Sequence, residues 1–242
     1  VGSRGIARVI LKRLEKITCL LSSDIRAVSV KNMNFAVQEK LYKRDKVKVI
    51  GNGGTIGVDM SEFNIEKKED LRTLTRKNYG IKEKCFVFGF IGRLTKDKGA
   101  NELLAAYKIL HDKGYVSKMI LVGSVESTNG LDSDLLEWAK HCDDVIIAGV
   151  FPRKELPGFY AAFDCYVHPT YREGFGMVLQ EAGAMGNAII TTDVPGASEV
   201  MENNVSCKLV PAKDILELSK TMEDMINNAK WARQLGQAAY ER

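Results

Sequence analysis

The sequence predicts an α/β protein built on a parallel, doubly wound sheet with helices on both faces. Short apolar runs, typical of buried strands, alternate with segments whose apolar residues recur at helical spacing. From about residue 84 to residue 225, a single helix separates each strand from the next. Such crossovers are right-handed and join parallel strands, so we expect one Rossmann-like domain there. The 242 residues, 45% of them hydrophobic, are enough to bury its core.

The first block of the chain also alternates between helices and strands. It ends in a run of glycines, and a charge-dense segment with helical spacing follows and stops at Gly80, a residue type that commonly ends helices. We expect this segment, residues 61–79, to be a solvated connector. The predicted elements of the first block are a helix at 6–21, a strand at 25–30, a helix at 33–44 and a strand at 47–50.

In the second block, the periodicity predicts six strands with helices between them. The strands are expected at 85–91, 118–124, 144–150, 165–170, 187–193 and 207–211. The helices are expected at 100–114, 133–142, 155–163, from near Phe175 to 186, at 197–203 and, as one long polar helix with a solvated face, from Ala212 to Arg242. This repeated order supports the parallel sheet.

The glycine run VKVIGNGGTIGVD, residues 47–59, looks at first like a dinucleotide loop, in which a strand feeds a glycine loop that cradles a phosphate. That fingerprint needs a helix starting at the last glycines and a second strand, closed by an acidic residue, about 20 positions on. Here the residues that follow form the charged connector and contain no strand pattern. The sequence therefore disfavours an NAD-dependent oxidoreductase.

Composition and charge disfavour several classes of protein. A net charge of +4, from 35 basic and 31 acidic residues, is too balanced to predict nucleic-acid binding. The five cysteines form no C-x-x-C pair, which argues for a reducing compartment and against structural zinc. No run approaches the roughly 20 apolar residues that span a bilayer. We expect a cytoplasmic protein; the amphipathic helix at 6–21 could lie on a membrane surface, but packing against a sheet is favoured.

The strongest chemical signal is the segment YREGFGMVLQEAGAMG, residues 171–186. Gly174 and Gly176 lie where a loop should become a helix, so exposed backbone amides and the helix dipole would face a bound anion. Glu173 and Glu181 flank this phosphate site, about 9 to 12 Å apart at the usual helical rise. Carboxylates accept hydrogen bonds from vicinal hydroxyls, and a sugar nucleotide has such hydroxyls on both sides of its diphosphate. The segment therefore predicts a sugar-nucleotide site.

The loop GRLTKDKG after the strand at 85–91 adds positive charge. It places Arg93 and Lys98 at the carboxyl edge of the sheet, where open α/β sheets bind ligands. Two cations there would neutralise a departing diphosphate. Because these side chains would stabilise the leaving diphosphate, we expect no metal ion. Lys96 is expected to face solvent.

These motifs, in this order, resemble the C-terminal half of retaining glycosyltransferases of the GT-B fold. The matching stretches are IGRL and KDKG within 91–99, the apolar strands ILVGS and VIIAGV, and PTYREGFG, which opens the E-x7-E pair Glu173 and Glu181. Within that fold the chain is similar to GT4-type enzymes that build capsular polysaccharide, O-antigen and lipid-linked oligosaccharide. The resemblance extends over roughly residues 45–225.

The resemblance implies a role for each site residue. Glu181 would bind the ribose of the nucleotide and Glu173 the hydroxyls of the donor sugar. Arg93 and Lys98 would hold the diphosphate. The remaining implied contacts are phosphate contacts at Gly174, Phe175, Gly176 and Met177, contacts with the base at Gly149 and Val150, and an approach to the phosphates from the opposite side at Gly53 and Gly54.

The resemblance also implies an organisation and an activity. Residues 1–59 would be the remnant of an N-terminal, acceptor-side Rossmann-like domain, 60–83 a connector and 84–242 the donor-binding domain. The enzyme would be a hexosyltransferase that moves a sugar from a UDP- or GDP-sugar to a glycan or lipid-linked acceptor with retention, without a metal or other cofactor. Peripheral contact with the inner face of the membrane would come through the N-terminal domain.

Two departures from the family pattern leave alternatives open. Relatives carry a stretch close to GSxNGVD where this chain has Ile56 in place of the asparagine, and by the resemblance we expect the core of the acceptor domain, with an important histidine, to be absent from these 242 residues. None of His111, His141 and His168 is a convincing substitute, and His168 is expected to be structural. We therefore expect little activity from this chain alone. The alternative is a non-catalytic sugar-nucleotide-binding module that works with a separate chain carrying the acceptor domain.

Overall fold

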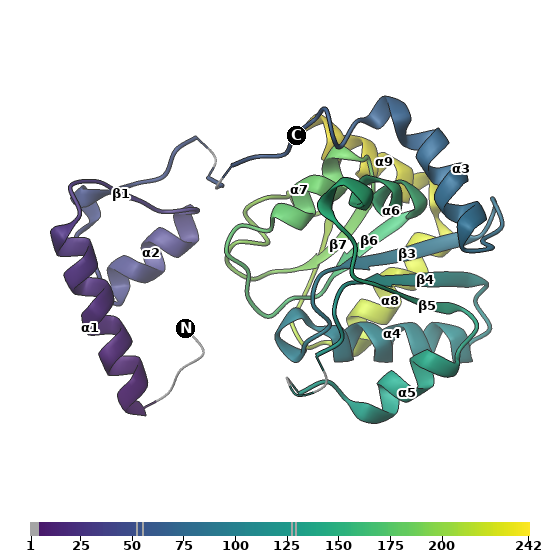
Figure 1. Ribbon diagram of the computed structural model, residues 1–242, viewed down its shortest axis with the longest axis horizontal. Coiled ribbons are helices and arrows are strands. Elements are labelled where there is room, and N and C mark those ends of the chain that lie inside the picture. Colours follow the sequence, from purple (N-terminus) through teal and green to yellow (C-terminus); the bar gives the residue numbers. More distant parts are fainter. Residues whose placement is uncertain (1–4, 52, 55, 127, 129) are drawn as a thin grey trace. The chain divides into compact units, whose positions relative to one another are not determined.

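The structure is a computed structural model that describes residues 5–51, 53, 54, 56–126, 128 and 130–242 (Figure 1). Residues 1–4, 52 and 55 of the predicted N-terminal remnant lie outside this part of the chain. The chain divides into two compact units, the first ending at Ile56 and the second comprising Gly57–Arg242. Each unit is described by itself.

The first unit combines two helices with a short parallel strand pair. Its elements are α1 (Gly5–Leu21), β1 (Ile25–Arg26), α2 (Val30–Gln38), the 3-10 helix η1 (Arg44–Lys46) and β2 (Val47–Lys48). In the pair, Ile25 lies opposite Val47 and Arg26 lies opposite Lys48. The order of elements follows the sequence pattern, and the strands are shorter than expected.

Helix capping explains why the strand predicted at 25–30 is short. The hydroxyl of Ser29 accepts a hydrogen bond from the Asn32 amide, which starts α2 directly after it. At the other end of α2, Lys40 has a φ of 56°, a left-handed conformation that a continuing helix does not allow. The helix predicted at 33–44 therefore starts and ends earlier than expected.

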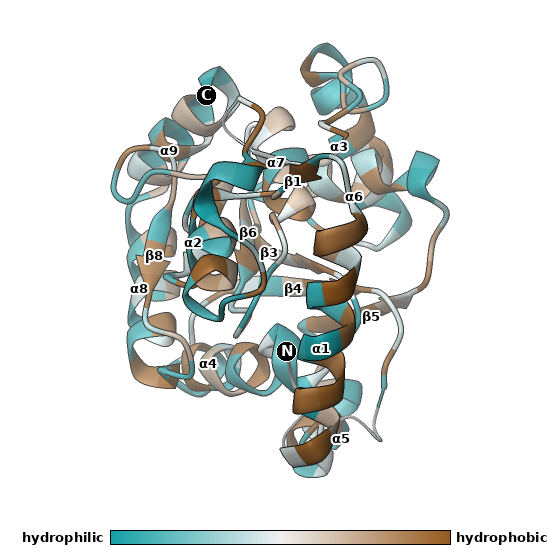
Figure 2. Ribbon diagram, turned by 90° about the vertical axis from the view of Figure 1, so that its left-hand side faces the viewer, coloured by the Kyte–Doolittle hydropathy of each residue, from teal (hydrophilic) through white to brown (hydrophobic). Residues whose placement is uncertain are grey.

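The helix α1 is strongly amphipathic. More than half of the surface of Ile6, Leu14, Ile17 and Leu21 is exposed, and Figure 2 shows brown, apolar bands along this helix. Cys19 is its buried residue. Among the residues described, no helix has both the length and the apolar content needed to cross a bilayer. In the first unit as described, the apolar face of α1 is therefore open.

Six parallel strands form the sheet of the second unit, in the order β5-β4-β3-β6-β7-β8. The strands are β3 (Phe86–Ile91), β4 (Ser117–Val122), β5 (Val145–Gly149), β6 (Cys165–His168), β7 (Ala188–Thr192) and β8 (Lys208–Val210). In chain order, β3 is the first strand of this sheet. The strands β4 and β5 follow on one side of it, and β6, β7 and β8 follow on the other side. This order confirms the predicted Rossmann-like sheet and creates a switch point between β3 and β6.

Helices cover both faces of this sheet (Figure 1). The helical elements are η2 (Ile65–Lys67), α3 (Lys68–Asn78), η3 (Lys96–Lys98), α4 (Ala100–Asp112), α5 (Ser133–His141), η5 (Arg153–Glu155), α6 (Leu156–Ala162), α7 (Met177–Ala184), α8 (Ile215–Asn227) and α9 (Ala229–Glu241). Side chains of β3 alternate between the two cores: Phe88 and Phe90 pack with residues of α4 and α8, whereas Val87 and Ile91 pack with residues of α6 and α7. A strand buried on both faces needs an uninterrupted apolar run, as FVFGFI is.

The predicted connector is not simply a solvated segment. Arg76 of α3 is 1% exposed, and its guanidinium donates to the carbonyls of Ala162 and Glu83 and to the carboxylate of Asp164. A buried arginine is tolerated when its donors find acceptors in this way. The helix α3 therefore packs on α6 within the second unit, which corrects the expectation for residues 61–79.

Two helix predictions in the middle of the second unit are wrong. The helix α7 begins at Met177, not near Phe175, because Gly176 has a φ of 62° that lies outside helical geometry. Residues 197–203, expected to be a short helix, form consecutive turns followed by an isolated bridge at Asn203.

The last predicted helix is two helices. The side chain of Asn228 accepts a hydrogen bond from the Trp231 amide, so it caps α9 and ends α8. Neither helix is merely solvated, because Leu218 and Met222 of α8 and Leu235 of α9 are buried in the core. Both helices therefore help to close the second unit.

Candidate functional site

The candidate site lies at the carboxyl edge of the six-stranded sheet, beside the switch point. Lys98 follows β3, Gly149 ends β5, and Glu173 follows β6. Parallel strands place all their carboxyl ends at one edge of a sheet, and ligands of open α/β sheets bind there. The fold therefore brings these three loops to a common edge.

Glu173 is held by two donors on one of its oxygens. Lys98 Nζ lies 2.8 Å from Glu173 Oε2, and His168 Nε2 lies 3.0 Å from the same atom. The other oxygen, Oε1, accepts the Gly174 amide at 3.1 Å. Two predicted site residues, Lys98 and Glu173, thus meet from positions 75 residues apart.

His168 is a core residue at the end of β6, and its ring contacts Glu173 from the buried side of the site. Its side chain is 1% exposed, and its ring stacks on Phe90 and Tyr166 with centroid distances of 6.0 and 5.9 Å. Burial lowers the pKa of His168, so the ring is neutral at neutral pH. To donate to Glu173 it must carry its proton on Nε2. His168 therefore helps to fix the orientation of the Glu173 carboxylate.

Glu173 is ionised throughout the physiological pH range. Burial alone would raise its pKa, but hydrogen bonds from His168 and Lys98, together with the charge of Lys98, outweigh burial and lower the pKa to about 2. The side chain is 16% exposed. A permanently charged acceptor therefore borders the site.

The start of α7 supplies backbone donors beside Glu173. No side chain caps this helix at Gly176. In the part of the chain that the structure describes, the amides of Phe175, Gly176 and Met177 donate to no protein acceptor. Unpaired amides at the positive end of a helix favour an anion. Gly174, next to them, is exposed, so a ligand meets no side chain there.

Two glycines let neighbouring loops pack tightly around this turn. At Gly196, with a φ of 84°, a Cβ atom would lie 2.3 Å from the carbonyl oxygen of Glu173. At Gly99, with a φ of 73°, it would lie 2.0 Å from the carbonyl oxygen of Pro169. Both positions need glycine for the backbone conformation and for the space. The loops after β3, β6 and β7 are therefore packed backbone against backbone.

Glu181 makes a separate set of contacts on α7. Its side chain is 3% exposed; Oε1 accepts from Arg153 Nη1 at 2.7 Å, and Oε2 accepts from the Tyr160 hydroxyl at 3.0 Å. Arg153 also pairs with Glu62 and lies over the ring of Phe63, 5.2 Å from its centroid. Burial raises the pKa of Glu181, although both donors oppose this. In this structure each oxygen of Glu181 already has a donor.

Arg93, by contrast, is not part of the Glu173 cluster. It is exposed, and its Nη1 pairs with Glu126 Oε2 at 3.2 Å. At the end of β5, Gly149 has a φ of 89° and Val150 is 73% exposed, so this side of the site is open. The structure therefore places Arg93 at the predicted edge but directs its side chain elsewhere.

Gly53 and Gly54 belong to the first unit. Their φ values are 100° and 109°, and the Gly54 amide donates to the Val28 carbonyl at 2.8 Å. Because each unit is described by itself, their contact with a donor stays a prediction.

Three partners of the glutamates were not foreseen from the sequence. His168 carried a usable signal, because it ends a strand five residues before Glu173 and so lies at the same edge. Arg153 and Tyr160 carried no local signal, because they reach Glu181 only through the packing of α6 and η5 against α7.

The sequence matches known proteins over most of its length. The family model for glycosyl transferases group 1 matches residues 72–242. The capsular polysaccharide biosynthesis glycosyltransferase CapM from Staphylococcus aureus is 32% identical over 234 residues, which are 96% of this chain and 60% of CapM. A D-inositol 3-phosphate glycosyltransferase from Thermobifida fusca (strain YX) is 28% identical over 191 residues, 75% of this chain and 43% of that protein.

Solved structures share the fold. A sucrose-phosphate synthase from Thermosynechococcus elongatus has a TM-score of 0.80 at 21% identity and covers 100% of this chain, which matches 58% of that protein. The Anabaena protein Alr3699/HepE, solved with UDP and glucose, has a TM-score of 0.77 at 21% identity, over 95% of this chain and 61% of its own. These likenesses confirm the predicted GT-B fold. The chain spans 43% to 61% of the length of these four proteins.

Proposed function

Because the chain belongs to the group 1 glycosyl transferases, we propose that it is the donor-binding part of an enzyme that transfers a sugar from a UDP- or GDP-sugar to a glycan or lipid-linked acceptor. The proposed reaction is a hexosyl transfer with retention, needs no metal ion, and belongs to polysaccharide or cell-envelope biosynthesis. Its acceptor side would require a second Rossmann-like domain.

One observation carries the proposal: a lysine and a charged carboxylate meet beside the unpaired amides of a helix start. Lys98 lies 2.8 Å from Glu173, next to the beginning of α7. A diphosphate would find a cation and free N–H donors there, and the adjacent carboxylate would accept hydrogen bonds from sugar hydroxyls. That combination suits the junction between a diphosphate and a sugar.

In the proposed complex, the residues act as follows. Lys98 and the amides at Phe175 and Gly176 hold the diphosphate and stabilise the negative charge that grows on it as the sugar leaves. Glu173 accepts from the hydroxyls of the sugar, and Glu181 accepts from the ribose. Arg93, whose exposed side chain pairs with Glu126, would turn toward the phosphates.

The relatives support the substrate class. CapM is named for capsular polysaccharide biosynthesis, and the Anabaena neighbour was solved with UDP and glucose. Retention, the choice of nucleotide and the acceptor rest on the family resemblance alone.

A second candidate is a non-catalytic sugar-nucleotide-binding module that acts with a separate acceptor chain. One observation favours it: the Glu173 and Glu181 clusters are built from residues of the second unit alone, so a nucleotide could bind without an acceptor domain.

Calorimetry with UDP, GDP and NAD tests the proposal. We expect UDP or GDP to bind and NAD not to bind. Glu181→Ala should weaken the nucleotide about tenfold or more, because a hydrogen bond to a charged group contributes roughly 1.5 to 3 kcal/mol. Gln180→Ala, on the same helix, is the matched control and should bind as the unchanged chain does. Binding of NAD alone would overturn the assignment.

Turnover separates the enzyme from the module. The chain is mixed with UDP-glucose or GDP-mannose, and release of UDP or GDP is followed with time. Nucleotide release that Glu173→Gln abolishes supports an enzyme, whereas tight binding without release supports the module.

A further inference from the structure

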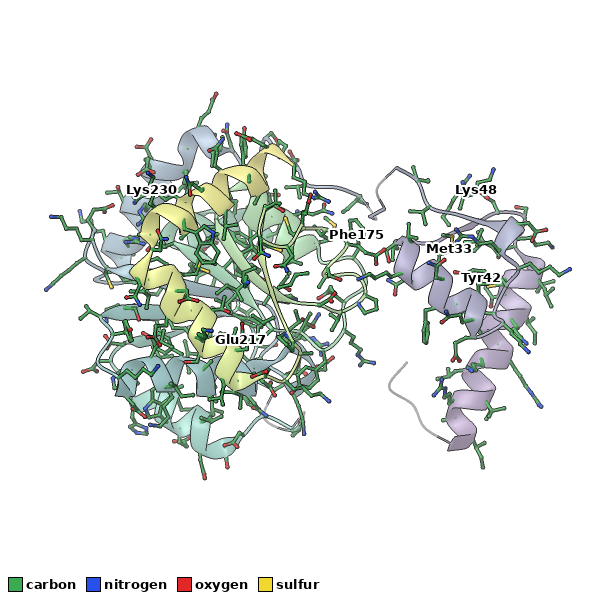
Figure 3. The ribbon with its side chains drawn as sticks, turned by 180° about the vertical axis from the view of Figure 1, so that it is seen from behind. Met33, Tyr42, Lys48, Phe175, Glu217 and Lys230 are labelled. Carbon is green, nitrogen blue, oxygen red and sulfur yellow. The ribbon has the colours of Figure 1, made fainter. Side chains whose placement is uncertain are left out.

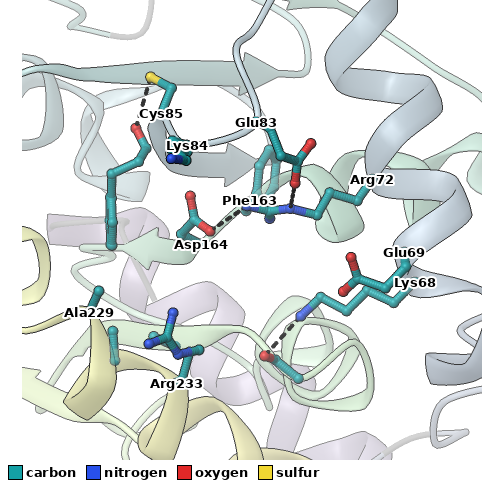
Figure 4. A pocket seen from close by; sticks show the side chains of 14 residues that line it. Lys68, Glu69, Arg72, Glu83, Lys84, Cys85, Phe163, Asp164, Ala229 and Arg233 are labelled. Atoms are coloured by element: carbon teal, nitrogen blue, oxygen red, sulfur yellow. Dashed lines mark hydrogen bonds and ion pairs between the residues drawn. The ribbon is translucent and has the colours of Figure 1, made fainter.

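A cavity lies at the amino edge of the same sheet, opposite the edge that carries the candidate site. It has a volume of about 470 Å³, and Figure 4 shows it from close by. Its lining includes Lys84, Asp164 and Gly186, which lie one or two residues before β3, β6 and β7. It is therefore separated from the Glu173 cluster by the length of the strands. Its volume is in the usual range for small-molecule sites, roughly 300 to 1,000 Å³.

The carboxylate at the centre of this cavity is already neutralised. Asp164 accepts from Arg72 Nη2 at 2.8 Å and from Arg76 Nη2 at 2.7 Å. Its Oδ2 also accepts the backbone amide of Val87 at 2.8 Å. Arg72 reaches Glu83 as well, at 3.4 Å. Asp164 therefore has little capacity left to balance further positive charge.

Three other cations line the cavity without an ion pair to a described residue, although the carboxylate of Glu69 also lines it, beside Lys68. Lys68 Nζ donates to the Gly186 carbonyl at 3.0 Å and makes no ion pair within the described residues. Lys84 and Arg233 are exposed, and neither side chain forms a hydrogen bond or ion pair with another described residue. Figure 4 shows Lys84 and Arg233 on the same side of the cavity and Lys68 across from them, all drawn around Asp164.

The backbone adds to this positive character. Lys68 opens α3 and Ala229 opens α9, and both residues line the cavity. The start of α9, with its positive dipole end, therefore borders this space, whereas α3 continues from η2 and has its free end at Asn64. Burial lowers the pKa of Lys68 to about 8, and the nearby charge of Arg72 acts in the same direction. An anion beside the ammonium would remove this penalty.

We propose that this cavity binds a phosphate-bearing small molecule, held by Lys68, Lys84 and Arg233. A phosphate has three acceptor oxygens and up to two charges, and it matches three convergent cations better than a single carboxylate does. Phe86 lies half-buried in the lining and offers an apolar surface to an organic group attached to the phosphate. The site is distinct from the proposed donor site, because it uses the other ends of the strands.

NMR titration tests the site locally. Inorganic phosphate is added at constant ionic strength, and the amide signals of Lys68, Asp164 and Ala229 are followed. Saturable shifts are expected at these amides. The double variant Lys84→Ala/Arg233→Ala should weaken the apparent affinity about tenfold or more, because two charged hydrogen-bond donors are removed. Both side chains are exposed, so the variant should fold normally.

Lys230→Ala is the matched control, because Lys230 lies on α9, three residues before Arg233, but does not line the cavity (Figure 3). Its titration should equal that of the unchanged chain. A hexose 6-phosphate, titrated in parallel, identifies the source of the phosphate: tighter binding than inorganic phosphate indicates a sugar phosphate, and equal binding indicates free phosphate. Absence of saturable shifts, or equal shifts in the double variant, would overturn the proposal.

Discussion

Glu173 and Glu181 are the two ends of one E-x7-E motif, yet the protein gives them opposite electrostatic surroundings. Glu173 accepts from Lys98 and His168, and its pKa falls to about 2. Glu181 also has two donors, but it is more deeply buried, and burial raises its pKa. Glu173 is therefore ionised throughout the physiological pH range, whereas ionisation of Glu181 costs free energy because the side chain is buried.

The difference arises from how each cation is held. Lys98 is itself largely buried, at 22% exposed, so its charge acts on Glu173 through little water. Arg153 is 48% exposed and divides its donors between Glu181 and Glu62. Water and a second carboxylate both weaken its effect on Glu181. The spacing of a motif therefore sets where its carboxylates lie, and the partners set how each is charged.

The largest effect should follow from Glu173→Gln, which removes the permanent anion. We expect the free energy of unfolding at pH 7 to fall by up to about 3 kcal/mol, since a pKa displaced from its usual 4.5 to about 2 corresponds to that amount. Because the folded pKa is depressed, this contribution is complete above pH 5 and is lost as the pH falls toward 2. Urea denaturation at pH 7 and pH 3 measures it.

The control for this variant is Glu66→Gln, an exposed carboxylate on η2, which should change stability by less than about 0.5 kcal/mol. If Glu173→Gln proves as stable as the unchanged chain at pH 7, the ionised form of Glu173 does not stabilise the fold, and the contrast in charge between Glu173 and Glu181 is wrong.

A smaller effect is expected from Arg153→Ala, which leaves Glu181 with one donor. The loss of stability at pH 8 should be about 1 to 2 kcal/mol, below the usual cost of breaking a buried pair because Arg153 is half exposed. The pKa of Glu181 is raised, so its ionised form lowers stability as the pH increases past 4.5, and removing Arg153 should strengthen that trend. The loss should therefore shrink at pH 5.

Urea denaturation at pH 5 and pH 8 checks this prediction. Arg172→Ala is the matched control, because Arg172 forms an exposed pair with Asp97 at 3.5 Å and should show no dependence on pH in this range. Equal losses at both pH values for Arg153→Ala would mean that burial does not destabilise the ionised form of Glu181.

The smallest effect should come from Tyr160→Phe. It removes the hydroxyl that donates to Glu181 Oε2 but keeps the ring, which packs on Phe63 and Tyr166. We expect a loss of about 1 to 1.5 kcal/mol in the free energy of unfolding, at the low end for a hydrogen bond to a charged group, because Arg153 still pairs with the carboxylate. Tyr240→Phe, on the partly exposed ring of α9, serves as the control in thermal melts. A loss above about 3 kcal/mol would show that Tyr160, and not Arg153, holds Glu181.

The sheet could be predicted from the sequence because each strand is a continuous apolar run between helical segments, as FVFGFI is for β3. Lys98 and Glu173 could be predicted to meet because both follow strands, and parallel strands share a carboxyl edge. The ends of elements were harder to predict. A single hydroxyl at Ser29 and a single amide at Asn228 decide where helices begin, and neither changes the apolar periodicity.

Contacts that depend on packing between helices could not be predicted from the sequence pattern. Arg76 looks like one more charge on a charged helix, yet it is buried against the segment between α6 and β6. Arg93 was expected near the phosphates because of its loop, but the position of Glu126 in the loop after β4 draws its side chain away. In both cases the deciding partner comes from a distant part of the chain.

The glycine at position 196 has a consequence for how such a site can change over evolutionary time. Since a side chain there would collide with the backbone of Glu173, any lineage that replaced Gly196 would have to rebuild the turn at Glu173 in the same step. At the end of β5, a side chain in place of Gly149 would meet no atom within 4 Å, although its φ of 89° still favours glycine. A substitution at Gly149 would therefore strain that residue alone, while the turn at Glu173 and its supporting loop must be inherited together.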